Sequence, residues 1–484
     1  MHFSSIFKML GIIILVLGVS QFVPLGYDLL FYPQNVWPLV WSLLTALGVG
    51  GSLALLPKSK HQFRTKDGFA LVSFGWVAAG VFGALPYWYA GAIPSFTDAF
   101  FEAVSGFTTT GSSILADIEA VPRGLLLWRS FTQWLGGMGI IVLALAIVPY
   151  LNFGGGMSLF QAEVPGPTAE KLTPKIQDTA KVLWYVYSLI TVLQIAALWG
   201  VGYSWFDSIN HSMTTVSTGG FSTNNKSVAG FHNAWGEWII IFFMVISGMN
   251  FALHYQYLHK KFLFKVYRQD SELRFYLLVI FFAVATIFTV IWFKQGKHDM
   301  DTFRGVVFSV TTIITTTGFA TDDFEFWPLY GQLMLLLLMV IGGSAGSTAG
   351  GMKTVRILLV IKYMHSEMLK LLHPNLVRTV KLQKTQVPRN VLAGIMGFTF
   401  IYSAVMIVSI MLVSLEIEDM TTAISAVLAC LGNIGPGLGN VGPYDNFSGL
   451  GDFTKWVLSF NMLMGRLEIL TMLVLLLPQT WQKG

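Results

Sequence analysis

Long apolar runs alternate with short polar connections along the whole chain. After two such runs near the amino terminus, one arrangement recurs four times: a run long enough to span a bilayer, an amphipathic stretch of about half that length, a glycine-bearing loop and a second long run. About 20 apolar residues suffice for a helix to cross the hydrocarbon core. The pattern therefore predicts an all-α polytopic membrane protein with four pseudo-symmetric repeats around a central pore, preceded by two extra transmembrane helices.

The two amino-terminal runs cover about Phe7–Val23 and Val36–Leu56, and Pro24 and Gly26 favour a turn between them. The remaining pattern divides the chain into an N-terminal two-helix extension, residues 1–66, and four pore repeats, residues 67–160, 161–265, 266–385 and 386–484, of which the third has a broken second span. The half-length helices are predicted over Ser95–Thr108, Phe206–Val216, Asp301–Ile314 and Thr421–Leu431. The second spans are predicted over Leu125–Tyr150, Trp235–His259, Trp327–Ile361 and Thr454–Leu477.

The loop after each half-length helix carries a glycine at an equivalent position. The four loops read Thr109-Thr110-Gly111-Ser112, Thr218-Gly219-Gly220-Phe221, Thr316-Thr317-Gly318-Phe319 and Asn433-Ile434-Gly435-Pro436. Threonine and glycine are ordinary turn residues at helix ends, so one copy would mean little. Four copies in register, each after a half-length helix, favour a shared function. The fourth loop departs most from the others, because Asn433 and Ile434 replace the threonines.

A non-helical backbone at membrane depth has to be buried in protein or line water. Glycine allows backbone angles that other residues resist, and four such turns around one axis would form a ring of carbonyl oxygens able to replace the hydration shell of a monovalent cation. Short helices whose carbonyl ends point at the axis would favour positive charge there. Threonine hydroxyls add acceptors without charge, which suits K⁺ better than Mg²⁺ or Ca²⁺. We therefore predict that the four loops form a filter for K⁺, the transported ion, and that no cofactor is bound.

Composition places the apolar runs in a membrane. The 484 residues are 54% apolar and 11% charged, whereas soluble domains are about 25% charged. Cys430 is the single cysteine, which excludes an internal disulfide and a cysteine metal cluster. The runs contain no paired carboxylates and no nucleophile with a base, which disfavours an enzyme.

The basic residues are unevenly distributed. Of the 30 Lys and Arg, 20 lie in four segments: Lys58–Lys66, Ala162–Lys181, His259–Arg274 and Lys353–Arg389. The positive-inside rule predicts that these segments are cytoplasmic. Two spans per repeat and two in the extension then place both termini in the cytoplasm and the signature loops toward the outer face.

These features together resemble the Trk/Ktr/HKT superfamily of potassium-uptake proteins, in particular its bacterial membrane subunits. The resemblance rests on the fourfold order of elements, on the two extra amino-terminal spans, on the run from Gly342 to Lys353 and on Gly465-Arg466-Leu467-Glu468. It covers essentially the whole chain. In that family the loop carbonyls form the K⁺ filter, so the resemblance implies this role for the four loops here. Plant members that select sodium carry Ser where the first repeat has Gly111, so K⁺ is the expected ion.

The resemblance also implies partners and a location. Members of the superfamily work with a cytosolic, TrkA-like ring of nucleotide-binding regulatory subunits and form homodimers. We expect both partners here, in the bacterial inner membrane, together with membrane lipid and without nucleic acid. The basic segment Lys353–Arg389 is explained by the positive-inside rule and also by docking of such a regulatory subunit.

A run of small residues interrupts the second span of the third repeat: Gly342-Gly343-Ser344-Ala345-Gly346-Ser347-Thr348-Ala349-Gly350-Gly351. Such a run would break a transmembrane helix, and broken helices persist where they line a cavity. Close helix packing through small residues is the alternative explanation. A nucleotide-binding P-loop is disfavoured, because Met352 intervenes before Lys353 and no strand precedes the run. The resemblance assigns the run as an intramembrane loop that gates the pathway beneath the filter.

Two charged residues, Arg466 and Glu102, lie within predicted helices that are mainly apolar. Arg466 lies in the last span, where a permanent charge is costly and usually faces a pathway or a partner. Glu468 is a poor direct partner for it, since residues two apart do not face each other on a helix. The resemblance places Arg466 in the pore below the filter, either as an electrostatic barrier or as a residue that holds the glycine run. Glu102, in the first half-length helix, would either attract cations or support its loop by hydrogen bonding.

The main alternative to a channel-like K⁺ pathway is a cation-coupled secondary symporter. Symporters often contain inverted repeats, whereas the four repeats here all begin on the same side and share one topology. The sequence therefore favours the potassium-translocating membrane subunit of an uptake system, gated by the regulatory ring. It is compatible with passive flux and with symport driven by H⁺ or Na⁺.

Overall fold

The computed structural model describes residues 3–57, 65–147, 176–259, 263–375, 379–383 and 385–482, and its regular structure is almost entirely α-helical. Within these ranges the strands form one short antiparallel hairpin, β1 (Lys381–Leu382) with β2 (Thr385–Gln386), in which Lys381 pairs with Gln386. The prediction of an all-α chain is confirmed for the described residues.

The helices follow the predicted order. The amino-terminal extension forms α1 (Phe3–Ser20), α2 (Phe22–Phe31) and α3 (Trp37–Ala54). The first repeat region contains α4 (Thr65–Tyr89), α5 (Phe96–Phe107) and α6 (Arg123–Ile147), and the second contains α8 (Ile176–Gly200), α9 (Trp205–Val216), α10 (Ala234–Ser247) and α11 (Phe251–His259). The third contains α12 (Lys265–Gln269), α13 (Ser271–Gln295), α14 (Met300–Ile314), α15 (Leu329–Val340) and α16 (Thr354–Leu372). The fourth contains α17 (Arg389–Val413), α18 (Met420–Gly432), α19 (Asp452–Arg466), α20 (Leu470–Leu476) and α21 (Pro478–Trp481).

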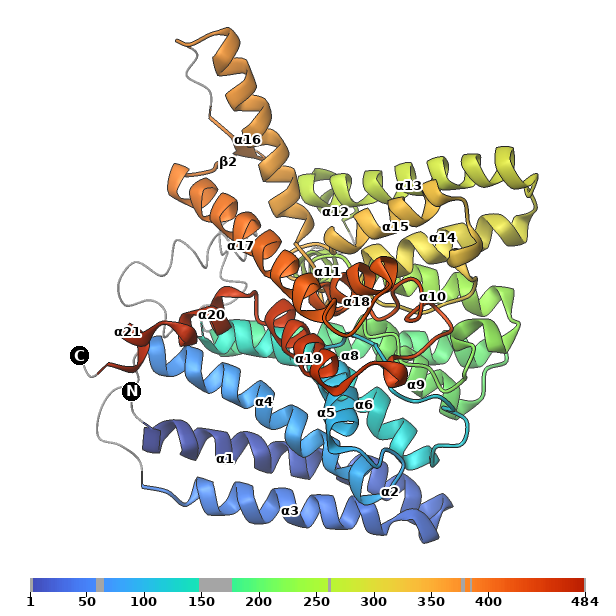
Figure 1. The fold of residues 1–484 in the computed structure, drawn as a ribbon, viewed down its shortest axis with the longest axis vertical. Coiled ribbons are helices and arrows are strands. Elements are labelled where there is room, and N and C mark those ends of the chain that lie inside the picture. The colour runs from blue at the N-terminus through green and yellow to red at the C-terminus, as the bar shows by residue number, and fades with distance from the viewer. Residues whose placement is uncertain are drawn as a thin grey trace.

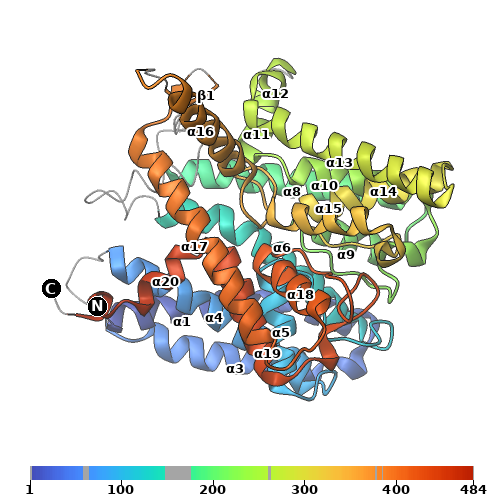
Figure 2. The same ribbon diagram turned by 45° about the horizontal axis from the view of Figure 1, so that its top comes forward.

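Two of the short helices, α5 and α18, lie toward the middle of the molecule. Figure 1 shows α1, α3 and α4 along one side and α13, α14 and α15 along the opposite side, with α5 and α18 between them. The helix α16 extends away from the body in both views (Figures 1 and 2). The two ends of the described chain meet: the rings of Phe3 and Trp481 stack with centroids 6.4 Å apart, and Lys66 Nζ donates to the Gln482 carbonyl at 2.6 Å. Both ends therefore lie on the same side of the molecule.

Six described helices are long and apolar enough to cross a membrane by length and composition. Two more pairs, α10 with α11 and α19 with α20, pass the same test together, although they are bent by 93° and 118°. In the third repeat region α15 ends at Val340 and α16 begins at Thr354, so a non-helical segment separates them.

The predicted turn at Pro24 and Gly26 is wrong. Residues Phe22–Phe31 form α2, and the chain turns only after Tyr32. Pro24 lies in the first turn of α2, where a helix has no use for the missing backbone N–H, so the proline does not end the helix.

The predicted continuous second spans of the second and fourth repeats are also wrong. In the second, Gly248 to Asn250 interrupt the helix, and the Asn250 side chain accepts the Ala252 N–H at 2.9 Å and so begins α11. In the fourth, Glu468 and Ile469 adopt positive φ angles of 58° and 49°, which turn the chain sharply between α19 and α20. Neither break follows a run of glycines, which is why composition did not reveal it.

Each of the four short helices α5, α9, α14 and α18 begins at a polar cap. The side chains of Ser95, Ser204, Asp299 and Asp419 accept backbone N–H groups three residues further on, at 3.4, 3.1, 3.0 and 2.8 Å. Such caps satisfy donors that a helix start otherwise leaves free. Hydrogen bonds from the Thr302 N–H and hydroxyl lower the pKa of Asp299, which keeps this cap ionised at the positive end of the helix dipole. The caps explain why these helix boundaries lie close to the predicted ones.

The helices α1 and α3 pack closely through glycine. A Cβ atom placed on Gly50 would lie 2.9 Å from the Leu15 backbone nitrogen and 3.0 Å from the Gly11 carbonyl oxygen. Small residues allow such close approach of helix backbones in membranes. Gly48, on the same helix, has no atom within 4 Å of an added Cβ.

This difference predicts the effect of adding one methyl group to α3. Gly50→Ala should lower the free energy of unfolding by about 1–3 kcal/mol, because the helices must separate. Gly48→Ala, the matched control, should leave stability unchanged or raise it slightly, since alanine favours helix. Thermal unfolding of both variants in detergent measures the difference. Equal melting temperatures would contradict the close packing of α1 and α3.

Candidate functional site

The four signature loops (residues 109–112, 218–221, 316–319 and 433–436) share one backbone conformation. Two positions before the signature glycine, the φ angles of Thr109, Thr218, Thr316 and Asn433 are 53°, 57°, 56° and 54°. The φ angles of Gly111, Gly220, Gly318 and Gly435 are also positive, at 86°, 77°, 84° and 110°. A β-branched threonine rarely adopts a positive φ, so three such residues at equivalent positions indicate a backbone imposed by the surrounding structure.

The same hydrogen bonds close the end of each short helix. The N–H before the signature glycine donates to the carbonyl five residues earlier in every loop: Thr110 to Ser105 at 2.9 Å, and Gly219 to Thr214, Thr317 to Thr312 and Ile434 to Ala429 at 2.8 Å. This pairing around a left-handed residue is the Schellman motif. Asparagine adopts the left-handed region more easily than threonine. The departure at Asn433 therefore changes the side chain and keeps the backbone.

The loops contact one another in a closed cycle. A Cβ added to Gly111 would collide with the Gly219 carbonyl oxygen, one on Gly220 with that of Thr317, and one on Gly318 with that of Ile434. The cycle closes where a Cβ on Gly435 would lie 3.0 Å from the Thr110 carbonyl oxygen. The carbonyl before each signature glycine thus touches the glycine of the preceding loop. This arrangement brings four equivalent carbonyl oxygens into one ring and leaves no room for a side chain at its glycines.

Side chains also join the fourth loop to the first. The Ser112 hydroxyl donates to the Gly435 carbonyl at 2.9 Å. The Asn433 amide donates to the Thr110 hydroxyl at 2.9 Å and to the Met462 carbonyl at 2.9 Å. Asn433 therefore ties its own loop both to the first loop and to α19.

Two residues of α6 support the first and second loops, and the sequence analysis missed both. Arg129 donates to the Ser222 carbonyl at 2.9 Å, and its guanidinium lies 3.5 Å from the centre of the Phe221 ring. Gln133 donates to the Gly219 carbonyl at 2.6 Å and accepts the Phe221 N–H at 3.1 Å. The available signal was their spacing: residues four apart share one helix face, and polar residues within a span face the protein interior.

Glu102 supports the first loop. Its side chain is fully buried and accepts the Ile114 N–H at 2.8 Å and the Ser113 hydroxyl at 3.1 Å. It also pairs with Arg129 at 2.6 Å. Of the two roles considered from the sequence, these contacts are those of loop support, because the carboxylate has no exposure to passing cations.

The glycine-rich segment (residues 341–353) connects α15 to α16 and is buried against the signature loops. The Gly350 N–H donates to the Thr316 hydroxyl at 2.7 Å, directly at the left-handed residue of the third loop. A Cβ on Gly350 would lie 2.8 Å from the Asn433 Cβ of the fourth loop. The Thr348 hydroxyl donates to the Val216 carbonyl at 3.0 Å, at the end of α9. The segment therefore contacts the base of three of the four signature loops.

The break between α10 and α11 meets this segment. The Ser344 N–H donates to the Gly248 carbonyl at 2.9 Å, and the Phe251 N–H donates to the Gly346 carbonyl at 3.0 Å, so the gap between α10 and α11 pairs with the segment's backbone. The Ala345 N–H donates to the Glu272 carboxylate at the start of α13, at 2.6 Å. Backbone groups that the broken helices leave free thus satisfy one another.

Arg466, the last residue of α19, holds the same segment. Its guanidinium donates to the Thr348 carbonyl at 2.8 Å and to the Gly136 carbonyl of α6 at 2.9 Å, and the residue is 3% exposed. Glu468 pairs instead with Arg356, at 2.5 Å. The structure thus brings the two predicted gate elements, the glycine run and Arg466, into direct contact beneath the signature loops.

Comparisons with known proteins agree over the full chain. A family model described as "TrkH: Cation transport protein" matches residues 41–483. The Trk system potassium uptake protein TrkH of Escherichia coli (strain K12) is 40% identical over 100% of both chains, and TrkG of the same organism is 33% identical over 99% of both. The crystal structure of the potassium transporter TrkH from Vibrio parahaemolyticus matches with a TM-score of 0.91 and 36% identity over 100% of both chains. The expected resemblance to the bacterial membrane subunits of the Trk/Ktr/HKT superfamily is confirmed, and the chain belongs to the TrkH family of cation transport proteins.

Proposed function

We propose that this chain is the potassium-translocating membrane subunit of a bacterial K⁺ uptake system and that it conducts K⁺ through a carbonyl-lined filter. The relatives are named as potassium uptake proteins and a potassium transporter. The observation that carries the proposal is the closed ring in which each signature glycine touches a carbonyl of the next loop. Four equivalent loops around one axis are the arrangement that can replace the hydration shell of a cation with backbone oxygens.

The chemistry of the ring fits a monovalent cation. None of its 16 residues is charged, whereas Ca²⁺ and Mg²⁺ sites draw on carboxylates. The four short helices α5, α9, α14 and α18 end at the ring, so the partial negative charge of their carbonyl ends is concentrated there. The ring therefore attracts a cation without binding it so strongly that release becomes slow.

The glycine-rich segment and Arg466 form the gate of this proposal. The segment contacts the Thr316 hydroxyl and the end of α9, directly beside the signature loops. Its hydrogen bonds come from several separate elements, so a coordinated shift of these elements would release it. Arg466 both fixes the segment at Thr348 and places a buried positive charge beside it. Holding the segment and opposing cation passage are then two effects of one residue.

The cytosolic partner and the homodimer are further parts of the proposal. The helix α16 leaves the body of the molecule (Figure 1) and begins directly after the glycine-rich segment, so a force on α16 reaches the gate. Its far end exposes Leu371 and Leu372, at 84% and 73%. We place the docking surface of a TrkA-like regulatory ring on α16 and the following hairpin, on the cytoplasmic side that also holds both termini.

Neutralising this surface tests the docking site. Replacing the Lys and Arg residues between Lys362 and Arg389 by Gln should weaken binding of the regulatory subunit in a pull-down by about tenfold, since each lost charge removes steering and contact. The same number of Lys and Arg replaced on the predicted outer face, including Lys226 and Lys297, is the control. Unchanged affinity of the first variant would rule out this surface.

Gly318→Ser tests the filter. The added side chain would strike the Ile434 carbonyl, so the ring must widen at one junction. We expect the K⁺ to Na⁺ permeability ratio to fall by about tenfold, equivalent to about 1.4 kcal/mol. Gly91→Ser is the matched control, because Gly91 also has a positive φ, of 66°, but no neighbour within 4 Å of an added Cβ. Reversal potentials in mixed K⁺ and Na⁺ give both ratios. An unchanged ratio in Gly318→Ser would refute the filter assignment.

Arg466→Ala tests the gate. Removing the guanidinium releases the Thr348 carbonyl from its hydrogen bond and removes the positive charge beside the segment. Flux without the regulatory subunit should therefore rise by about tenfold. Cation uptake into liposomes measures this flux, and the elution profile in size-exclusion chromatography reports folding. Arg304→Ala, which removes an arginine that pairs with Glu237 and Asp301 instead, should leave basal flux unchanged. A well-folded Arg466→Ala protein with wild-type flux would remove the basis for the gate.

A further inference from the structure

The break between α19 and α20 is strained. Glu468 and Ile469 both have positive φ angles, of 58° and 49°, and Ile469 has a ψ of −57°. A β-branched residue is a clear outlier at positive φ. Such outliers persist only where surrounding contacts impose them, and they concentrate at functional sites. Local contacts hold this one in part, because the Ile469 N–H donates to the Met464 carbonyl at 2.7 Å and the Ile469 side chain is 1% exposed.

The break also makes an ion pair with the start of α16. The Glu468 carboxylate lies 2.5 Å from the Arg356 guanidinium, and Arg356 is 2% exposed. Arg356 stands in the first turn of α16, where its N–H donates to the Lys353 carbonyl at 2.9 Å at the end of the glycine-rich segment. Its guanidinium also lies 4.0 Å from the centre of the Phe398 ring of α17. Glu468 is thus the carboxylate that balances a buried charge at the end of the segment.

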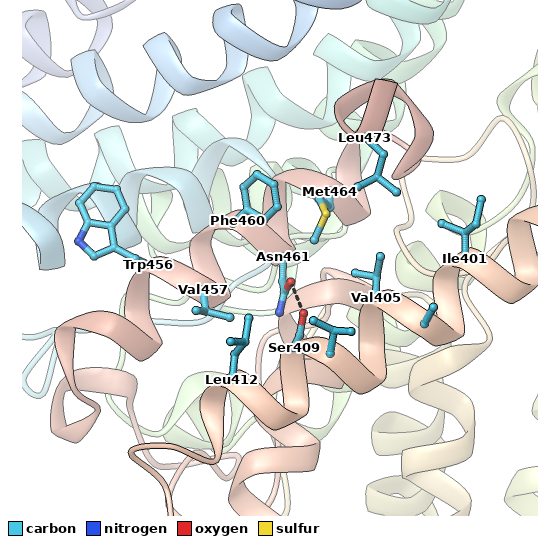
Figure 3. A pocket seen from close by; sticks show the side chains of 12 residues that line it. Ile401, Val405, Ser409, Leu412, Trp456, Val457, Phe460, Asn461, Met464 and Leu473 are labelled. Atoms are coloured by element: carbon cyan, nitrogen blue, oxygen red, sulfur yellow. Dashed lines mark hydrogen bonds between the residues drawn. The ribbon is translucent and has the colours of Figure 1, made fainter. Parts of the chain in front are cut away.

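A groove of about 550 Å³ lies beside the break, between α17 and α19. Figure 3 shows Met464 of α19 and Leu473 of α20 on its wall, at either side of the break. Its walls are mainly apolar, and the Ser409 hydroxyl donates to Asn461 across it at 2.8 Å. The ion pair to Arg356 is thus the contact that joins the break to the start of α16.

We propose that Glu468 is a positioning residue of the gate and that it holds the carboxyl end of the glycine-rich segment closed through Arg356. Arg466, two residues earlier, holds the middle of the same segment at Thr348. A stretch of three residues, 466–468, thus restrains the segment at two points, and both contacts have to open before the segment moves. This inference rests on the proposed function, in which the segment is the gate.

The proposal follows from the energetics of a buried charge. Without Glu468, Arg356 would stay buried and unpaired, which is strongly unfavourable. The closed state would then be destabilised relative to any state in which the start of α16 reaches water. A perturbation that affects one of two states more than the other shifts their populations. Loss of Glu468 alone should therefore favour the open gate and leave the ring of signature loops unchanged.

The experiment measures two quantities in liposomes without the regulatory subunit: basal K⁺ flux and the K⁺ to Na⁺ permeability ratio. Glu468→Gln should raise basal flux about tenfold and leave the permeability ratio at the wild-type value. Arg356→Lys, which keeps the charge, should raise flux much less. A change that merely loosened the whole protein would alter the permeability ratio as well, and that result would overturn the positioning role.

Two further variants separate gating from folding. In Arg356→Met/Glu468→Leu, apolar side chains replace both charges, a change that buried pairs often tolerate without loss of stability. This variant should fold and, because it leaves no buried unpaired charge, should carry much less basal flux than Glu468→Gln. Arg304→Met/Glu237→Leu is the matched control, because it removes an ion pair of 2.6 Å that touches neither α16 nor the glycine-rich segment, and its basal flux should equal that of the wild type. A folded Arg356→Met/Glu468→Leu protein with flux as high as that of Glu468→Gln overturns the proposal.

Arg466→Ala distinguishes failure of this inference from failure of the proposed function. If Arg466→Ala raises flux while Glu468→Gln does not, the role of Glu468 is refuted and the gate stands. If the wild-type protein and every variant carry no K⁺ with the regulatory subunit present, the proposed function fails, and the inference fails with it.

Discussion

Non-helical backbone inside a membrane has to find its hydrogen-bond partners within the protein, and this constraint shapes both parts of the candidate pathway. At the signature loops these hydrogen-bond partners lie within the same stretch of chain. Each short helix ends with the same pair of backbone bonds around a left-handed residue, and the loops then rest on one another. At the glycine-rich segment the hydrogen-bond partners come from other elements of the protein. The break between α10 and α11 exchanges backbone hydrogen bonds with the segment, and Arg466 at the end of α19 donates to the Thr348 carbonyl.

The two regions differ in what a small displacement would do. In the ring, each signature glycine contacts a carbonyl oxygen of a neighbouring loop. A shift of one loop would therefore push against the next, which opposes a change in the size of the ring. The glycine-rich segment is held by single contacts from separate elements, among them Thr316, Gly248, Glu272 and Arg466. A rigid ring suits selection between ions of similar charge, whereas a segment held at several separate points suits a gate. Thr316 of the third loop accepts the Gly350 N–H of the segment, so its hydroxyl couples the two regions directly.

Much of this architecture could be predicted from the sequence. The short helices begin at Ser and Asp caps, and their ends are marked by the repeated glycine, so their boundaries are readable from local chemistry. The break at the glycine run was readable for the same reason. The turn at Pro24 was misplaced because proline in the first turn of a helix does not end it. Local chemistry therefore sufficed wherever the residues themselves fix the backbone.

The remaining features depend on contacts between distant parts of the chain. The break at Glu468 and Ile469 has no sequence signature, since both residues adopt angles that they avoid by themselves, and Arg356 lies more than a hundred residues away. The support of the loops by Arg129 and Gln133 was missed because periodicity assigns a face to a residue but not a partner. In the same way, the sequence placed Arg466 near the glycine run by resemblance, while the bond to the Thr348 carbonyl required the fold.

The central claim is that the four signature loops form one cation site on a common axis. The most direct measurement is the anomalous scattering of crystals grown with Rb⁺, which substitutes for K⁺. The account predicts anomalous peaks inside the ring, in contact with carbonyl oxygens from all four loops. Rb⁺ bound elsewhere on the protein, with none in the ring, would contradict it.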